Sequence, residues 1–194
     1  MKKHILILLG HPALSRKSFC EALALAYQKG AQEAGHTTEL VNIAKLDFDP
    51  ILHEGYEGDQ PLEPDLAKTQ EQIHQADHLV IIYPMWEYMM PALLKGFFER
   101  VFTRGFAYDL KSRNPLKNGL LQGKSARIIQ TMSMPAIIYR LFFGAHGIKA
   151  LKSMLGFCGL RPLKATCFGM IMESRDKHRK ACLAKSEALG RKGI

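Results

Sequence analysis

Hydrophobic and polar positions follow two spacings that alternate along the chain. Apolar runs typical of buried strands lie at Leu6–Leu9 and His78–Tyr83. Residues Thr38–Ile43 alternate enough for another strand, and Arg127–Thr131 and Leu163–Ile171 are also predicted to be strands. Apolar residues that recur every three or four positions predict helices with one buried face from Phe19 to about Gly35 and from Pro91 to Phe102. Asp65–Ala76 is predicted to be a polar, capped helix, and Ile148–Phe157 and Arg175–Leu189 are also predicted to be helices. Strand–helix alternation predicts an α/β protein with a five-stranded parallel, doubly wound sheet.

The connection after the third strand is short and unusually aromatic. Pro84 ends the strand because it has no N–H to donate, and Pro91 opens the next helix, where the missing donor costs nothing. Trp86 and Tyr88 lie between these prolines. Open α/β sheets bind ligands beyond the carboxyl ends of their strands, so this turn is a candidate site. The alternative is that the two rings only cover the edge of the core.

The loop after the first strand is polar and basic, from Ala13 to Ser18. Ser15 or Ser18 can cap the following helix. The start of that helix would direct free backbone N–H groups and a positive dipole end toward a phosphate above the strand. The signal is weak alone, because the glycine spacing of a P-loop or dinucleotide fingerprint is missing.

In the order 2-1-3-4-5 the loops after strands one, three and four meet at one edge of the sheet, where such folds place a flavin. The loop after strand four, Met132–Gly144, is predicted to be irregular. We found no repeat and no linker in the 194 residues, so we expect one domain spanning residues 1–194, built as a three-layer α/β/α sandwich.

Composition and charge indicate the cellular compartment of the protein better than its function. The formal net charge of +9 suits nucleic acid, an anionic membrane surface or an acidic small molecule, but the basic residues are scattered and no nucleic-acid-binding pattern accompanies them. No apolar run approaches the ~20 residues of a membrane helix, and Ile5–Leu9 is too short for a signal peptide, so we expect a cytoplasmic protein. Four cysteines without a CxxC pair predict reduced, buried thiols and no metal site.

The chain resembles the flavodoxin-fold NAD(P)H:quinone oxidoreductases, the DT-diaphorase-like enzymes, over nearly its whole length. The strongest portion spans residues 83–108, where Tyr-Pro-Met-Trp is followed by Pro-Ala-Leu-Leu-Lys-Gly and Glu-Arg-Val-Phe. These stretches are similar to the family's Tyr-Pro-Leu-Trp-Trp, Pro-Ala-x-Leu-Lys-Gly and Asp-Arg-Val-Phe. His11-Pro12 with Ser18-Phe19 resembles the family's phosphate-binding entry, and Gly156–Gly159 resembles its Phe-Cys-Gly turn.

The resemblance implies roles for individual residues. His11, Ser18, Phe19 and Cys20 would lie along the phosphate and ribityl chain of a flavin. The isoalloxazine would be bordered by Pro84, Met85, Trp86 and Glu87, with backbone N–H groups of this turn directed at the ring. Tyr139 and His146 would supply a proton to the acceptor. Thr131, Met132 and Ser133 stand where the family has Thr-Thr-Gly-Gly, and glycine lets backbone approach a flat ring, so we expect a reshaped pocket here.

The function implied by the resemblance is hydride transfer from NAD(P)H through flavin N5 to a quinone or similar acceptor, in a homodimer. Nothing in the sequence signals a groove for an adenosine half, so FMN is favoured and FAD stays open. The positive charge tilts the choice between NADH and NADPH slightly toward NADPH. Two alternatives remain: a flavodoxin-like electron carrier, and a regulatory ancillary subunit associated with a potassium efflux transporter in the membrane.

Overall fold

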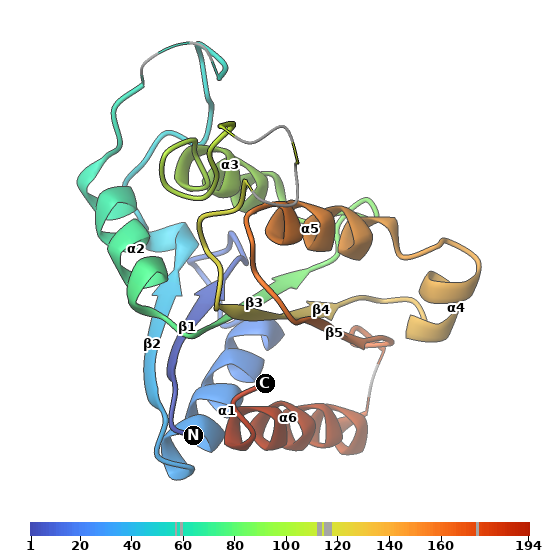
Figure 1. Ribbon diagram of the computed structural model, residues 1–194. Helices are drawn as coiled ribbons and strands as arrows, with labels where there is room; N and C mark the ends of the chain where they lie inside the picture. Colours follow the sequence, from blue (N-terminus) through green and yellow to red (C-terminus); the bar gives the residue numbers. More distant parts are fainter. Residues whose placement is uncertain (57, 59, 112–113, 115–117, 174) are drawn as a thin grey trace.

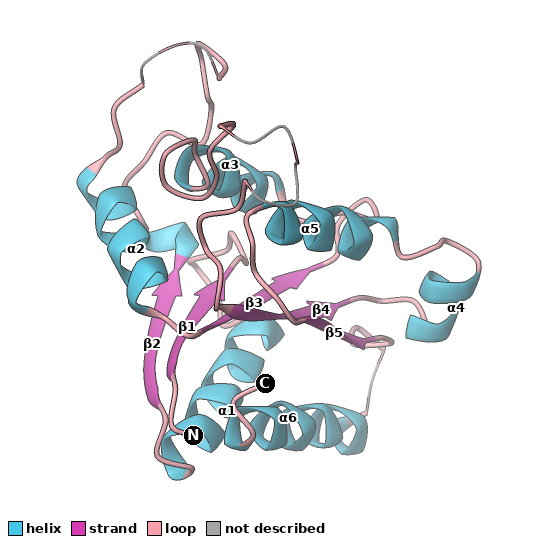
Figure 2. Cartoon of the chain, in the orientation of Figure 1, coloured by secondary structure: helices cyan, strands magenta, loops and turns pink. Residues whose placement is uncertain are grey.

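The sheet has the predicted strands and the predicted order. The computed structural model describes residues 1–56, 58, 60–111, 114, 118–173 and 175–194. Its five strands are β1 His4–Leu9, β2 Thr37–Asn42, β3 His78–Pro84, β4 Ser125–Thr131 and β5 Leu163–Phe168. All neighbouring pairs are parallel, and the order β2-β1-β3-β4-β5 confirms the flavodoxin-like arrangement predicted from the sequence (Figure 2).

Helices cover both faces of this sheet. They are α1 Phe19–Glu33, η1 Ile43–Lys45 (a 3-10 turn), α2 Pro64–Gln75, α3 Ala92–Val101, α4 Ala136–Leu141, α5 His146–Phe157 and α6 Asp176–Arg191. In Figure 1, α1 and α6 lie together on one face of the sheet, and α3 and α5 lie on the other. Within the described residues, no helix combines the length and apolar character needed to cross a bilayer.

The expectation of an irregular segment at residues 132–144 is wrong, because α4 lies within it. This helix has only six residues and is mostly apolar all round, so the three-to-four-residue spacing of a one-sided helix is missing. Several bounds also differ by one to three residues, and the largest difference is at β5. β5 ends at Phe168 rather than Ile171, and α5 begins at His146 rather than Ile148.

Alternate strand positions supply two cores. One face of β1 and β3 contributes Leu6, Leu8, Leu79, Ile81 and Tyr83 to the core beneath α2, α3 and α5. The opposite face contributes Ile5, Ile7, Leu9, Val80 and Ile82 to the core beneath α1 and α6. Successive residues of a strand point to opposite faces, so a strand that is buried on both faces requires an unbroken apolar run.

Close packing against α6 fixes the position of α1. A Cβ at Gly30 would lie 2.0 Å from the Glu187 carbonyl oxygen, and one at Gly190 would lie 2.0 Å from the Tyr27 carbonyl oxygen. The Ser186 hydroxyl also donates to the Leu23 carbonyl oxygen at 2.8 Å. Because neither glycine has a side chain, the two helix backbones touch, and the N-terminus of α1 is held firmly at the edge of the sheet.

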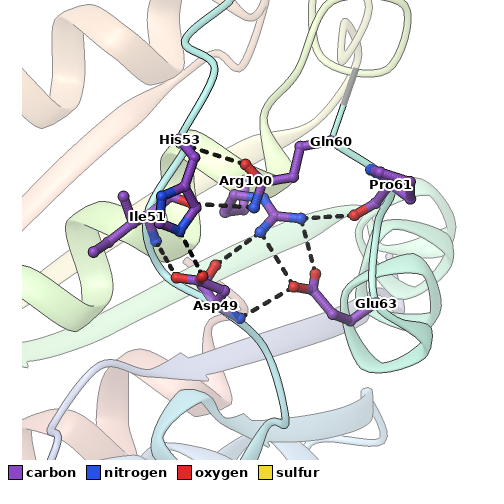
Figure 3. Close-up of polar contacts among 7 residues, drawn as sticks. All are labelled: Asp49, Ile51, His53, Gln60, Pro61, Glu63 and Arg100. Atoms are coloured by element: carbon purple, nitrogen blue, oxygen red, sulfur yellow. Dashed lines mark hydrogen bonds and ion pairs between the residues drawn. The ribbon is translucent and has the colours of Figure 1, made fainter. Parts of the chain in front are cut away.

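A buried arginine ties the long loop after β2 to α3, and the sequence interpretation missed it. The Arg100 side chain is 1% exposed. Its guanidinium donates to the Asp49 and Pro61 carbonyl oxygens, both at 2.8 Å, and to the Glu63 carboxylate at 3.0 Å (Figure 3). Buried charge is stable only when it is paired and hydrogen-bonded, as it is here.

Candidate functional site

A cavity of about 410 Å³ lies at the carboxyl ends of β1, β3 and β4, and we call it the rim cavity. The residues that line it come mainly from the loops after β1, β3, β4 and β5: His11, Arg16, Lys17, Ser18, Phe19, Cys20, Pro84, Met85, Trp86, Thr131, Met132, Ser133, Ile171, Met172 and Arg179. Every residue predicted to contact a cofactor is among them except Glu87. Residues separated by more than a hundred positions in the sequence are thus brought together.

The start of α1 forms one end of the rim cavity. Ser18, one of the two predicted caps, is the N-cap, and its hydroxyl oxygen accepts the Glu21 N–H at 3.1 Å. The Ala22 N–H bonds the Ser18 carbonyl oxygen at 3.2 Å. The amides of Phe19 and Cys20 therefore precede the first intrahelical bond and, with the helix dipole, favour an anion at this end.

Cationic side chains surround the same end. Arg16, Lys17 and Arg179 line the rim cavity, and among its described lining residues there is no acidic side chain. The Arg179 guanidinium carbon lies 5.8 Å from the centroid of the Phe19 ring and its nitrogen donates to the Ile171 carbonyl oxygen at 3.1 Å. These charges would form charge-assisted contacts with a phosphate, each worth roughly 1.5–3 kcal/mol.

His11 presents a neutral ring at the cavity. Its Nδ1 accepts the Ala13 N–H at 3.1 Å, so the proton of the neutral ring resides on Nε2 and can be donated. Burial, and then the nearby Arg16 charge, lower the pKa of His11 below its ordinary value of 6.5. The ring meets Trp86 edge-on, with centroids 5.9 Å apart. At neutral pH His11 therefore acts as a hydrogen-bond donor without a charge.

The floor of the rim cavity contains a thiol that is not reactive. Cys20 Sγ lies 3.3 Å from Thr131 Oγ1, and both residues are buried. Burial raises the pKa of the Cys20 thiol to about 12, and the bond with Thr131 opposes this only in part. The nucleophilic form of cysteine is the thiolate, so Cys20 serves as a neutral, packed surface beneath a ligand.

The aromatic turn after β3 is a tight two-residue hairpin from Trp86 to Met89. The Trp86 N–H bonds the Met89 carbonyl oxygen at 3.0 Å, and the Met89 N–H bonds the Trp86 carbonyl oxygen at 2.8 Å. Glu87 and Tyr88 between them have φ of 46° and 63°. Two successive left-handed residues define a type I′ turn, which favours Asn-Gly and costs a non-glycine residue about 1–3 kcal/mol. Such strain is found most often at functional sites.

This geometry changes which amides are free to contact a flat ring. The Met85 N–H is already bonded to the Thr131 carbonyl oxygen at 2.7 Å, and the Trp86 N–H is used by the hairpin. Pro84 has none. Of the four residues predicted to direct amides at the ring, only Glu87 retains an N–H outside these backbone bonds. Trp86 remains 47% exposed beside the cavity and can contribute its ring face.

The hairpin is supported from behind by α4 and α5. A Cβ at Gly147 would lie 2.5 Å from the Tyr88 carbonyl oxygen, so α5 touches the hairpin backbone. The Tyr139 hydroxyl donates to the same oxygen at a long 3.5 Å, and the side chain is fully buried. Burial raises the pKa of Tyr139. His146 is exposed at the first position of α5. Neither predicted catalytic residue lines the rim cavity, and their catalytic role stays a prediction.

The segment that replaces the family's glycines leaves the rim cavity open. The Met132 N–H bonds the Phe168 carbonyl oxygen at 2.9 Å, and the Met170 and Ile171 amides bond back to Met134 and Met132 at 3.2 and 3.1 Å. The segment therefore runs alongside the residues after β5. Met132 and Ser133 line the cavity without filling it.

A second cavity of about 480 Å³ lies on the far side of the hairpin, between α3 and α5. Its lining is mostly apolar and aromatic and includes Met89, Met90, Phe98, Tyr108 and Phe157, together with the charged residues Lys95 and Glu99. The hairpin thus separates the two cavities, with Trp86 facing one and Met89 facing the other. The rings of Tyr108 and Phe157 lie 5.1 Å apart at its wall.

The rim cavity fits a flavin mononucleotide in its chemistry. It combines an anion site at a helix N-terminus with a partly apolar wall of Trp86, Met85 and Met132. Its volume falls in the range of small-molecule sites, and a planar ring with a phosphorylated side chain needs both parts. The fold and this cavity together define a protein of the flavodoxin class.

Comparisons with known proteins agree with that class. Residues 3–189 match the model of the flavodoxin-like fold family. A Haemophilus influenzae protein named as an NAD(P)H oxidoreductase is 31% identical, over 92% of this chain and 89% of its own length. The guinea-pig (Cavia porcellus) NAD(P)H dehydrogenase [quinone] 1 is 28% identical over 84% of this chain, which covers 66% of that longer enzyme.

Two solved structures are similar throughout. Smu.1420 from Streptococcus mutans is 32% identical with a TM-score of 0.79, covering 97% of this chain and 99% of that one. The NAD(P)H:quinone oxidoreductase from Methanothermobacter marburgensis is 28% identical with a TM-score of 0.81, covering 98% of both chains. The chain belongs to the flavodoxin-like fold family, and these relatives confirm its resemblance to the NAD(P)H:quinone oxidoreductases of that fold.

Proposed function

We propose that the chain is a flavin-dependent NAD(P)H:quinone oxidoreductase that holds FMN in the rim cavity. The observation that carries the proposal is the pairing of the α1 N-terminus with the partly apolar wall at Trp86 in one cavity. The names of the relatives point to the same reaction. A bound flavin supplies the two-electron exchange between nicotinamide and quinone, and the protein supplies binding and orientation.

Binding starts at the phosphate. The Phe19 and Cys20 amides and the Arg16 and Arg179 charges would hold it, since together they provide both donors and positive potential. The neutral His11 would donate its Nε2 proton to an oxygen of the side chain. FMN is proposed over FAD because these groups account for a single phosphate end, and the NADPH preference rests only on the positive charge of the chain.

The ring would lie against the hairpin. Trp86 supplies an apolar face and the Glu87 amide a donor, while the hairpin's reciprocal hydrogen bonds hold both in place before a ligand arrives. Removing one preorganised donor of this kind typically lowers the catalytic rate by about 10²–10³-fold.

Protons for a quinone would come from the α5 side. His146 is exposed and directly precedes Gly147, which touches the hairpin, so it can exchange protons with water. Tyr139 is buried behind the hairpin and would act on the acceptor through the position of the Tyr88 carbonyl. We therefore expect His146→Gln to lower kcat, and Tyr139→Phe to bind flavin normally while turning over more slowly.

We further propose a homodimer in a reducing, cytoplasmic setting. The second cavity opens to the surface beside the exposed apolar side chains of Met89, Leu110 and Phe157, and this is the face we assign to the second copy. The four cysteines are free, and three are buried. Sedimentation velocity would test the dimer: Leu110→Glu should yield monomers if this face is the interface.

The experiment that tests the function compares matched charge variants. Arg16→Gln should weaken FMN binding roughly tenfold or more, because one charge-assisted phosphate contact is lost. Lys68→Gln removes an exposed charge on α2, away from the cavity, and should leave binding unchanged. With oxygen excluded, the wild-type protein should oxidise NADH or NADPH beyond one equivalent only when a quinone is present. One-electron transfer without NAD(P)H oxidation would instead identify an electron carrier.

A further inference from the structure

Large apolar side chains are concentrated at the edge of the molecule that carries the rim cavity. On α4 and just after it, Ile137, Leu141 and Phe142 are 65%, 72% and 81% exposed. Leu14 in the loop after β1 and Met172 in the loop after β5 are 61% and 78% exposed at the same edge. Figure 1 shows α4 projecting from the end of β4 away from the body of the protein. Exposed apolar surface of this kind marks an interaction site.

The chain around α4 is strongly basic. From Leu110 to Met172 there is no Asp or Glu, whereas this stretch contains ten Lys or Arg residues. Arg140 lies on α4 itself, and Lys185 of α6 lines the same hollow as Ile137 and Arg140. Two basic side chains, Arg140 and Lys185, therefore lie beside the apolar side chains of α4, and α4 carries no acidic residue of its own.

Charge indicates which partner fits this surface. Two copies meeting through α4 would bring like charges together, which disfavours self-association there. An anionic bilayer instead attracts each nearby Lys or Arg and accepts protruding Leu, Ile and Phe side chains into the headgroup boundary. A lipid surface can accept the exposed side chains of a short helix without a groove of matching shape, which a protein partner would need.

We propose that α4 docks the protein onto an anionic phospholipid surface, with Leu141 and Phe142 inserted among the lipids and Arg140 and Lys185 at the headgroups. The rim cavity lies on the same edge, so docking would turn its mouth toward the membrane. The proposal concerns a surface of the chain and stands whether or not the proposed enzymatic function is correct.

Vesicle sedimentation of the purified protein tests the proposed docking. Vesicles containing phosphatidylglycerol should bind the protein at low salt and release it at high salt, and vesicles of phosphatidylcholine alone should bind far less. Leu141→Gln and Phe142→Gln should each weaken partitioning about tenfold, because each removes a side chain that buries in the lipid. Arg140→Gln should weaken it about fivefold.

Two further variants act as controls. Leu25→Gln removes an equally apolar, 53% exposed side chain from the middle of α1 and should not change binding. Phe142→Trp keeps an interfacial aromatic ring, so it should retain binding, and its added emission should shift to the blue on anionic vesicles.

Several results would overturn the proposal. Equal vesicle binding by wild type and the Leu141→Gln/Phe142→Gln double variant would show that α4 is not the contact. The same holds if the Phe142→Trp emission stays unshifted on bound protein. If the double variant instead dissociates a dimer and binds vesicles normally, α4 faces a second copy.

Discussion

Replacing Gly147 with alanine tests whether α5 sets the position of the aromatic hairpin. The added Cβ would lie 2.5 Å from the Tyr88 carbonyl oxygen and 3.2 Å from the Tyr139 hydroxyl. An ordinary carbon–oxygen contact is about 3.3 Å, so the Tyr88 backbone must retreat by ~0.8 Å. Since Tyr88 is at the centre of a two-residue turn, Trp86 and Glu87 must move with it.

The expected cost follows from that displacement. Forcing one methyl group into a packed contact typically destabilises a protein by about 1–3 kcal/mol. A displacement near 1 Å in residues that position a reacting group can cost about a hundredfold in rate. We expect kcat/KM for quinone reduction to fall by roughly 10- to 100-fold and the melting temperature to fall as well.

A second glycine on the same helix provides the control. A Cβ at Gly156 would meet only Leu163 Cδ1, at an ordinary 3.6 Å. Gly156→Ala should therefore raise stability by up to ~1 kcal/mol through helix propensity and leave activity unchanged. The assays are thermal unfolding by circular dichroism, FMN titration of the apoprotein and steady-state quinone reduction. If Gly147→Ala behaves like Gly156→Ala in all three, the hairpin is not positioned by α5.

The remaining predictions address the cap, the buried ion pair and a buried histidine. Ser18→Ala should lower the free energy of unfolding by about 1 kcal/mol, because the Glu21 amide loses its cap. Ser18→Asp should keep the cap but weaken FMN binding in a titration, because its carboxylate repels the phosphate. Equal FMN affinities for wild type and Ser18→Asp would contradict a phosphate at this end. Arg100→Met should cost about 3 kcal/mol in urea unfolding, since Glu63 and two carbonyl oxygens lose their donor, and a cost below 1 kcal/mol would mean that the pair is not important for stability. Burial lowers the pKa of His78 to about 3 in the folded protein. Below about pH 6.5, His78 therefore binds a proton in the unfolded chain but stays neutral in the folded protein. The free energy of unfolding should therefore fall as the pH drops below 6.5, and between pH 6.5 and 5 wild type should lose about 1.5 kcal/mol more than His78→Gln. If the unfolding free energies of the two proteins change in parallel with pH, the lowered pKa of His78 is refuted.

The strands and most helices were predictable because their patterns are local. An unbroken apolar run such as Leu79–Tyr83 predicts a buried strand, and a serine followed by periodic apolar residues predicts the start of α1. α4 was not predictable in this way, because a six-residue helix that is apolar on most sides has no one-sided pattern. Its apolar residues are exposed, so the usual link between hydrophobicity and burial fails there.

For the candidate site, the sequence predicted its members better than their arrangement. The loops after β1, β3 and β4 were expected to meet, and they do. The hairpin at Glu87 and Tyr88 was not foreseen, because neither residue type favours positive φ. That turn uses the Trp86 amide, which a reading of the motif alone would leave free. Arg179 and Ile171 complete the cavity from the segment after β5, and long-range contacts of this kind have no local signal.

A flavin held at the carboxyl edge of the sheet is the basis of the proposed reaction, and the ligand released by heating the purified protein tests its presence most directly. We predict a yellow protein whose released compound has the absorption spectrum and mass of FMN, in about one equivalent per chain. A colourless protein that also fails to bind added FMN and FAD would contradict the assignment of the rim cavity and of the reaction.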